Sequence, residues 1–187
     1  MIFGLQKSAT IDGKEQPFRY DYRVILEIIL MLNDPDLTDA DKTEAIMTMF
    51  YLHPEEITDY REAVKQCFQF IDHSDRPPKK SPRLVDWEQD FDYIIAPVNR
   101  VLGYEVRSVD YDPEANTGGL HWWTFLAAYM EIGGDCLFSQ IVSIRDKRAR
   151  GKKLEKYERE WWRRNIDLVD IRSKYSDAEN KLLKEWT

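Results

Sequence analysis

The stretch LHWWTFLAAYMEIGGDCLF, residues 120–138, decides how the C-terminal half of the chain folds. Its first thirteen residues are mostly apolar and aromatic, which is typical of a helix buried on several sides. Gly133 and Gly134 then end the helix, because glycine is unfavourable inside one. We therefore expect a helix at the centre of a C-terminal lobe, with tryptophans that are mainly structural.

Composition and charge restrict the class of protein. The chain has 187 residues, of which 43% are hydrophobic and 13% aromatic, so there is material for a core. The formal net charge of -7 argues against a wholly electrostatic binder of DNA or anionic membranes. No apolar run is long enough to span a bilayer, and the N-terminus lacks the basic and apolar regions of a signal peptide. Cys67 and Cys136 are far apart, which favours buried thiols in a reducing cytoplasm, with one long-range disulfide as the alternative.

The N-terminal part predicts a hairpin followed by helices. Asp12-Gly13 lies between β-prone runs and is a strong two-residue turn signal. Apolar periodicity predicts helices over residues 20–32, from the Thr38 N-cap to about 51, and from His53 to 71. HSDRPPKKSPR, residues 73–83, has three prolines and no apolar side chain, which indicates an exposed connector.

The C-terminal part predicts further helices after this connector. Residues 86–103 have one apolar helical face, and Pro97 is expected to kink or split that helix. Asp135 is expected to cap another helix, and a charged helix and a last short helix, capped at Ser176, follow. The predicted fold class is therefore mainly α, with two helical lobes joined by a Pro/Lys-rich linker and a short N-terminal β-hairpin. The predicted divisions are an N-terminal lobe, a linker and a C-terminal lobe that includes the basic helix: residues 1–72, 73–85 and 86–187.

His121 and Cys136 are the residue types of a base and a nucleophile. Such partners meet in space and not in sequence, so the spacing proves nothing, and a helix-start histidine with a buried thiol is the simpler interpretation. Nucleotide-binding, zinc-protease and hydrolase motifs are absent from the sequence. We therefore nominate no catalytic residue, expect a non-enzymatic protein, and predict no cofactor.

Four carboxylates, Asp86, Glu88, Asp90 and Asp92, form an acidic cluster at the start of a predicted helix. Two like-charged i,i+4 pairs result, an arrangement that a metal ion would suit. Negative side chains are also common at helix N-termini, because the backbone dipole stabilises them there. No nearby histidine and no EF-hand spacing completes a metal site. The dipole interpretation is favoured, and no metal is predicted.

The basic stretch IRDKRARGKKLEKYEREWWRR, residues 144–164, is the best functional signal from the residues alone. From Arg145 to Arg164 there are ten Lys/Arg against four Asp/Glu. Cations interleaved with aromatic rings are used to bind single-stranded nucleic acid. A solvated helix whose tryptophans pack on the core is the favoured interpretation, and an acidic protein would suit the patch equally well. The candidate contacts are Arg159, Arg163 and Arg164.

The order of several segments resembles a known family. These segments are IDGKEQPF, LNDPDLT, the Pro/Lys linker, DWEQDFDYI, LHWWTFLAAYMEI and IRDKR. Together they resemble the small tail-gene family of long-tailed phages and prophages of Gram-positive bacteria, encoded between the tail tube and tape-measure genes. The most specific positions are Asp90, Asp92, Tyr93, Ile94, Leu120, His121, Trp122, Trp123 and Phe125. Pro97 and the loop 116–119 depart from the pattern, which puts the local helix boundaries in doubt.

The resemblance implies a tail assembly chaperone that binds the tape-measure protein, the tail tube protein or both. It implies the host bacterial cytoplasm as the location and absence from the mature virion. Self-association is possible, whereas nucleic acid is an unlikely partner and a membrane is not expected. The expected partner-binding residues are His121, Trp122, Trp123, Trp161 and Trp162. This hypothesis predicts that some of these tryptophans, or Trp186, form an exposed patch.

Overall fold

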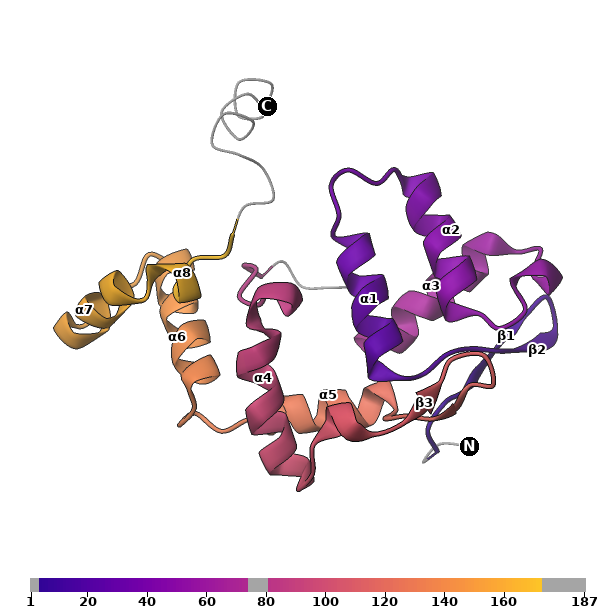
Figure 1. The fold of residues 1–187 in the computed structure, drawn as a ribbon. Helices are drawn as coiled ribbons and strands as arrows, with labels where there is room; N and C mark the ends of the chain where they lie inside the picture. Colours follow the sequence, from indigo (N-terminus) through magenta and orange to yellow (C-terminus); the bar gives the residue numbers. More distant parts are fainter. Residues whose placement is uncertain (1–3, 74–80, 173–187) are drawn as a thin grey trace. The chain divides into compact units, whose positions relative to one another are not determined.

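The computed structural model describes residues 4–73 and 81–172, and this part of the chain is mainly helical, as predicted. Eight α-helices and a short N-terminal antiparallel hairpin lie within it (Figure 1). The chain divides into two compact units. Unit 1 comprises Met1–Lys80 and Ile94–Ile132, and unit 2 comprises Ser81–Tyr93 and Gly133–Thr187.

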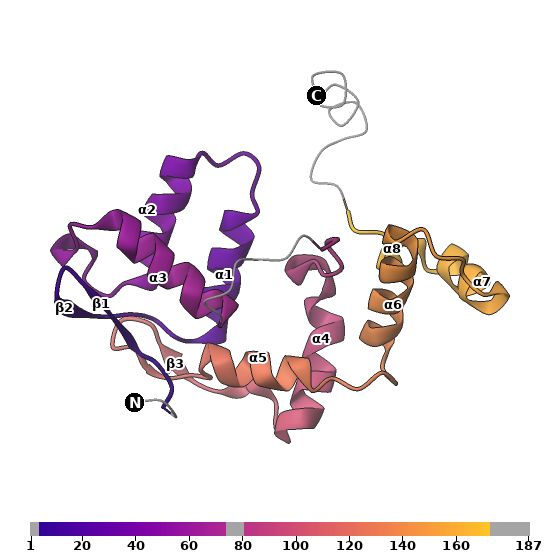
Figure 2. The ribbon, with the colours of Figure 1, turned by 180° about the vertical axis from the view of Figure 1, so that it is seen from behind.

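The predicted hairpin opens unit 1. Strands β1 (Ser8–Ile11) and β2 (Lys14–Pro17) pair in antiparallel register around Asp12 and Gly13, which both have positive φ. The Asp12 carboxylate accepts hydrogen bonds from the backbone of Thr58 and Asp59, 2.9 and 3.1 Å away. The turn is thereby fixed to the start of α3, and β1 packs on that helix (Figure 2).

Three helices follow the hairpin: α1 (Tyr22–Leu32), α2 (Asp39–Phe50) and α3 (Tyr60–Asp72). Thr38 caps α2 as predicted, in a capping box with Asp41. The third helix was predicted to start at His53. Instead, Pro54–Glu56 form a 3-10 turn (η1), and α3 begins after an Asp59 cap. Asp59 accepts from the Glu62 backbone N–H, so the chain has a cap available beyond the proline.

The rest of unit 1 comes from residues after the predicted linker. It consists of the second part of α4 (Trp87–Leu102), the 3-10 turn η2 (Val106–Ser108), a two-residue β-ladder of β3 (Tyr111–Asp112) with β4 (Thr117–Gly118), and α5 (Trp122–Met130). Helix α4 is continuous through Pro97, so of the two expected outcomes, a kink or a split, the split does not occur. The core of the unit is largely aromatic, with Phe18, Phe50, Phe70 and Phe125 at most 1% exposed.

Residues 94–132 were predicted to lie in the C-terminal lobe, and the structure places them with the N-terminal hairpin and helices. Backbone hydrogen bonds join the two segments. The Tyr22 N–H donates to the Leu120 carbonyl oxygen at 3.0 Å, and the Trp122 N–H donates to the Tyr20 carbonyl oxygen at 2.7 Å. Between them, the buried Asp21 carboxylate accepts from the Leu120 N–H at 2.8 Å. The sequence order of lobes therefore does not match their division in space. Residues 81–85 of the predicted linker belong to unit 2, and residues 74–80 lie outside the described part.

Unit 2 contains the start of α4, α6 (Leu137–Ala149), α7 (Lys156–Arg164) and the short α8 (Ile166–Val169). Helix α6 is capped by Cys136 and not by the predicted Asp135, because the Cys136 sulfur accepts from Ser139 N–H. Ile144, Leu154 and Val169 form a small core on which Trp161 and Trp162 pack. The predicted last helix and Trp186 lie outside the described residues.

Neither cysteine forms a disulfide in the described part of the chain. Cys67 is buried, and burial raises the pKa of its thiol. Cys136 is half-buried and not fully buried as expected, because its sulfur caps a helix end near the surface. Within residues 4–73 and 81–172, no helix has the length and apolarity needed to cross a membrane.

Two glycine substitutions test the packing around Asp21. A Cβ at Gly119 would lie 2.3 Å from Asp21 Oδ2 and 2.8 Å from Tyr111 Cδ2, whereas a Cβ at Gly13 would meet nothing within 4 Å. Both glycines have φ of +73°, so alanine costs a similar backbone strain of about 1 kcal/mol at either position. We expect Gly119→Ala to reduce the free energy of unfolding by about 1–3 kcal/mol more than Gly13→Ala in urea denaturation. Equal losses would contradict the close approach of residue 119 to Asp21.

Candidate partner-binding surfaces

His121 and Trp122 do not lie on a surface, which corrects their assignment as partner-binding residues. Their exposed fractions are 5% and 2%. His121 is the N-cap of α5: Nδ1 accepts from the Trp123 N–H, and Nε2 lies 2.7 Å from the Gln6 carbonyl oxygen. Burial lowers the pKa of the imidazole, which favours the neutral ring. Trp122 Nε1 donates to the Ile71 carbonyl at 2.9 Å, so both side chains are needed to assemble unit 1.

Trp123 is half-buried and has its own structural partners. Its indole stacks on the His73 ring, with centroids 4.2 Å apart, and Nε1 donates to the Phe70 carbonyl at 2.9 Å.

His121 and Cys136, which the sequence offered as a possible base and nucleophile, belong to different units.

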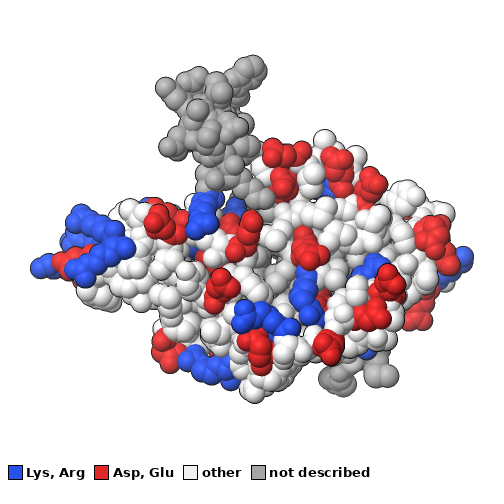
Figure 3. Space-filling model, in the orientation of Figure 1, with Lys and Arg blue, Asp and Glu red and all other residues white. Residues whose placement is uncertain are grey.

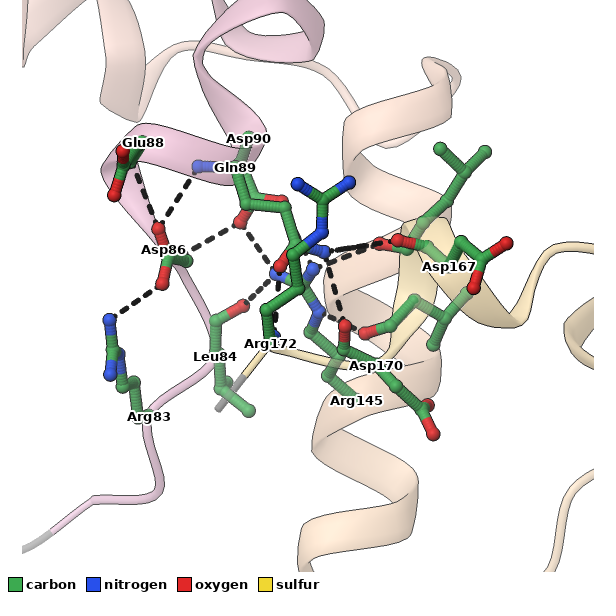
Figure 4. A network of polar contacts seen from close by, with 12 residues as sticks. Arg83, Leu84, Asp86, Glu88, Gln89, Asp90, Arg145, Asp167, Asp170 and Arg172 are labelled. Carbon is green, nitrogen blue, oxygen red and sulfur yellow. Dashed lines mark hydrogen bonds and ion pairs between the residues drawn. The ribbon is translucent and has the colours of Figure 1, made fainter. Parts of the chain in front are cut away.

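The acidic cluster separates into two structural residues, Asp86 and Asp90 (Figure 4), and two exposed ones. Asp86 Oδ1 accepts from the backbone N–H groups of Glu88 and Gln89 and so caps α4. Asp90 is fully buried, and its two oxygens accept from the Arg145 guanidinium at 2.5 and 3.0 Å. Glu88 and Asp92 are exposed. Helix capping thus accounts for Asp86, and a buried ion pair with Arg145 accounts for Asp90.

Arg145 is the central residue of unit 2. Besides Asp90, its guanidinium donates to the backbone carbonyls of Leu84, Leu168 and Val169 (Figure 4). Gln89 Nε2 adds a bond to the Asp170 carbonyl, 3.1 Å away. The guanidinium therefore connects the chain before α4 to α6 and α8.

In residues 4–73 and 81–172, no group of three or more His, Cys, Asp or Glu side chains could hold a metal ion.

Helix α7 presents the predicted basic residues to solvent. Arg159, Arg163 and Arg164 are exposed, and Lys and Arg gather over this helix in Figure 3. Trp161 and Trp162 face the other way and are half-buried on the small core. Arg148 lies over the Trp162 ring at 4.0 Å, and Trp162 Nε1 donates to Asp170 Oδ1 at 2.9 Å. None of the five tryptophans in the described ranges is among the exposed large hydrophobic side chains, so the four candidates Trp122, Trp123, Trp161 and Trp162 form no exposed patch.

An apolar groove in unit 1 is a surface that the sequence analysis missed. It lies between α2 and the η1–α3 connection and has a volume of about 420 Å³. Its lining comprises Ala40, Thr43, Glu44, Met47, Pro54, Glu55 and Tyr60. Tyr60 is 56% exposed, which is high for a large aromatic side chain. The groove depends on the break between η1 and α3, since a continuous helix from His53 would not form the same wall.

Two carboxylates line this groove, and further ones lie close to its lining residues in the sequence. From Asp34 to Asp59 the chain has eight Asp or Glu residues and one lysine, Lys42. Glu44 and Glu55 line the groove itself, and Asp39, Asp41 and Glu56 are exposed nearby in sequence. In Figure 3, acidic side chains gather over the α1–α2 loop and the start of α2. The groove therefore combines an apolar lining with a negative rim, and the acidic run was the one sequence signal that could have pointed to it.

Comparison with known proteins gives one match. A model of the family described as Bacteriophage Gp15 protein matches residues 4–171. This range includes every described helix and strand of both units. No curated protein and no solved structure matches the chain.

Replacing Arg145 tests the buried ion pair. Arg145→Met leaves the Asp90 carboxylate buried without its cation, so we expect a loss of about 3–5 kcal/mol in the free energy of unfolding. Arg150→Met is the matched control, because the Arg150 side chain is 55% exposed and its pair with Asp146 lies on the surface. That variant should lose less than about 1 kcal/mol. Urea denaturation followed by circular dichroism measures both, and similar losses would show that the pair does not hold unit 2 together.

Proposed function

Because the chain belongs to the bacteriophage Gp15 protein family, we propose that it is a non-enzymatic tail assembly chaperone or adaptor. In this proposal it binds the tape-measure protein, the tail tube protein or both while a long-tailed phage tail assembles. It acts in the host cytoplasm and is absent from the mature virion. The resemblance of its segments to tail genes encoded between the tube and the tape measure supports this role.

The apolar groove of unit 1 is the observation that carries the proposal. A helical client is commonly held by apolar side chains that enter a groove on a folded partner. Met47 and Pro54 supply an apolar surface, and the exposed Tyr60 ring adds a large contact area with a polar end. A tape-measure protein is long and helical, so it exposes apolar side chains that aggregate unless they are covered.

The rim of the groove narrows the kind of client segment. Glu44 and Glu55 place negative charge beside the apolar lining. Complementary charge favours association and orientation, so a client segment with Lys or Arg next to its apolar side chain fits best. We therefore propose that the groove receives an apolar side chain with cationic neighbours from the tape-measure helix.

Nucleic-acid binding by α7 is the second candidate. The exposed Tyr157 ring, with 67% of its surface accessible, lies on the same helix as the exposed Lys156, Arg159 and Arg164, a combination that suits stacking and phosphate contacts. The half-buried positions of Trp161 and Trp162 make this candidate weaker, because those rings already pack on the core. Binding that is absent at low salt, or unaffected by replacing Arg163 and Arg164, would exclude it.

Blocking the groove should abolish capture of the client. Ala40 is exposed and lines the groove, so Ala40→Arg adds a long side chain there. We expect co-purification of the tape-measure protein with the tagged chain to fall at least about tenfold when the neighbouring tail genes are co-expressed. Quantitative mass spectrometry of the eluates measures the loss.

Ala127→Arg is the control, because Ala127 is an exposed helical alanine of unit 1 that does not line the groove. It should capture as much client as the wild type. Equal capture by both variants would exclude the groove as the client site. A wild-type chain that captures neither tape-measure nor tube protein would contradict the chaperone function itself.

A further inference from the structure

Tyr157 is among the most exposed large hydrophobic side chains of the described residues, at 67%. It lies in the first turn of α7, at the edge of the side occupied by Glu158, Trp161 and Trp162, because Trp161 is four residues further along; together with Glu158 it lines a hollow against α6. Those three side chains are buried or half-buried, and Glu158 accepts a hydrogen bond from the Lys147 ammonium at 2.5 Å. The inner face of α7 is therefore occupied within unit 2, and its outer face is available.

The outer face of α7 is mostly cationic. With a helical repeat of about 3.6 residues, positions 156, 160 and 163 share the side opposite the buried residues. Tyr157, Arg159 and Arg164 flank this side. All six positions are exposed, and four of them carry a positive charge against one glutamate, Glu160. This outer face is therefore mostly cationic, with the exposed Tyr157 ring and Arg164 along one edge and Arg159 along the other.

The groove of unit 1 has the complementary chemistry. It offers an apolar lining of about 420 Å³, and its rim carries Glu44 and Glu55. The carboxylates from Asp34 to Asp59 extend the negative charge beyond the rim. An aromatic ring with cations beside it and an apolar groove with carboxylates at its rim match in apolar character and in sign of charge.

We propose that the outer face of α7 from one copy of the chain docks in the unit 1 groove of a second copy, with Tyr157 entering the groove. The cations nearest to Tyr157 on the helix surface, Lys156 and Arg164, then face Glu44 and Glu55. The contact is heterologous, since it joins two different surfaces, so a pair of copies keeps one free groove, on one copy, and one free α7, on the other. Self-association then runs head to tail and strengthens as protein concentration rises.

This contact would also compete with client binding in the groove, an inference that rests on the proposed function. A free apolar groove attracts unspecific partners, and α7 of a second copy covers it until a client segment takes its place. The self-association itself needs no client, so it is measured on the purified chain alone.

Charge reversal in two variants tests the proposal by sedimentation equilibrium. Variant A carries Lys156→Glu and Arg164→Glu, and variant B carries Glu44→Lys and Glu55→Lys; all four residues are exposed. At low salt the wild type should exceed its monomer mass of 22.3 kDa as concentration rises, and high salt should reverse this. Each variant alone should associate at least about tenfold more weakly, because like charges then meet.

A mixture of the two variants gives the sharpest result. The acidic α7 of variant A meets the basic groove of variant B, and the native α7 of B meets the native groove of A. Association should therefore return on mixing. Tyr157→Ala, with every charge kept, should also weaken association. Lys14→Glu with Arg172→Glu changes the net charge as variant A does, at exposed residues outside both surfaces, and should associate more strongly than variant A.

A wild type that stays monomeric at low salt up to millimolar concentration would overturn the proposal. Oligomers that persist in both variants, or a mixture that stays monomeric, would also overturn it. Circular dichroism confirms that each variant is folded. Client capture by variant A separates the two proposals, since its groove is native and it should still bind the tape-measure protein.

Discussion

The buried carboxylate of Asp21 is the constraint on which unit 1 depends. Its side chain is fully inaccessible, and its oxygens accept from the Arg23 backbone N–H, the Arg23 guanidinium and the Leu120 N–H. A buried charge is tolerated only when such donors surround it, so residues 119–122 must lie against the start of α1. That position brings Trp122 to the Ile71 carbonyl of α3 and holds His121 inside. The groove between α2 and the η1–α3 connection belongs to the same packed unit.

Local signals in the sequence were sufficient for most of the helices. Thr38, the turn at Asp12-Gly13 and the glycine pair after α5 act on their own neighbours, so their effects follow from the sequence alone. The pairing of Asp21 with Leu120, and of Asp90 with Arg145, joins residues far apart in the chain. No spacing rule predicts such pairs, which is why the lobe boundary and the role of the acidic cluster were assigned differently from the structure.

The candidate surfaces were only partly predictable for the same reason. Exposure of Arg159 and Arg163 follows from charge, whereas the burial of His121 and Trp122 depends on tertiary contacts that aromatic composition does not specify. The groove arises where η1 stops short of α3, a break that the periodicity of residues 53–71 conceals. The net charge of -7 also does not reveal that the two signs of charge are separated, with carboxylates at the groove and cations on α7. Opposite charges on separate surfaces suit the proposed role, in which the chain binds a client and copies of itself.

Amide hydrogen exchange on the co-purified complex tests the client site most directly. Exchange is compared, peptide by peptide, between the free chain and the chain bound to the tape-measure protein. The account predicts slower exchange in α2 and in residues 54–60, which surround the groove, and unchanged exchange in the buried α5. Unchanged exchange around the groove in a complex that has formed would contradict the assignment and place the client elsewhere on the chain.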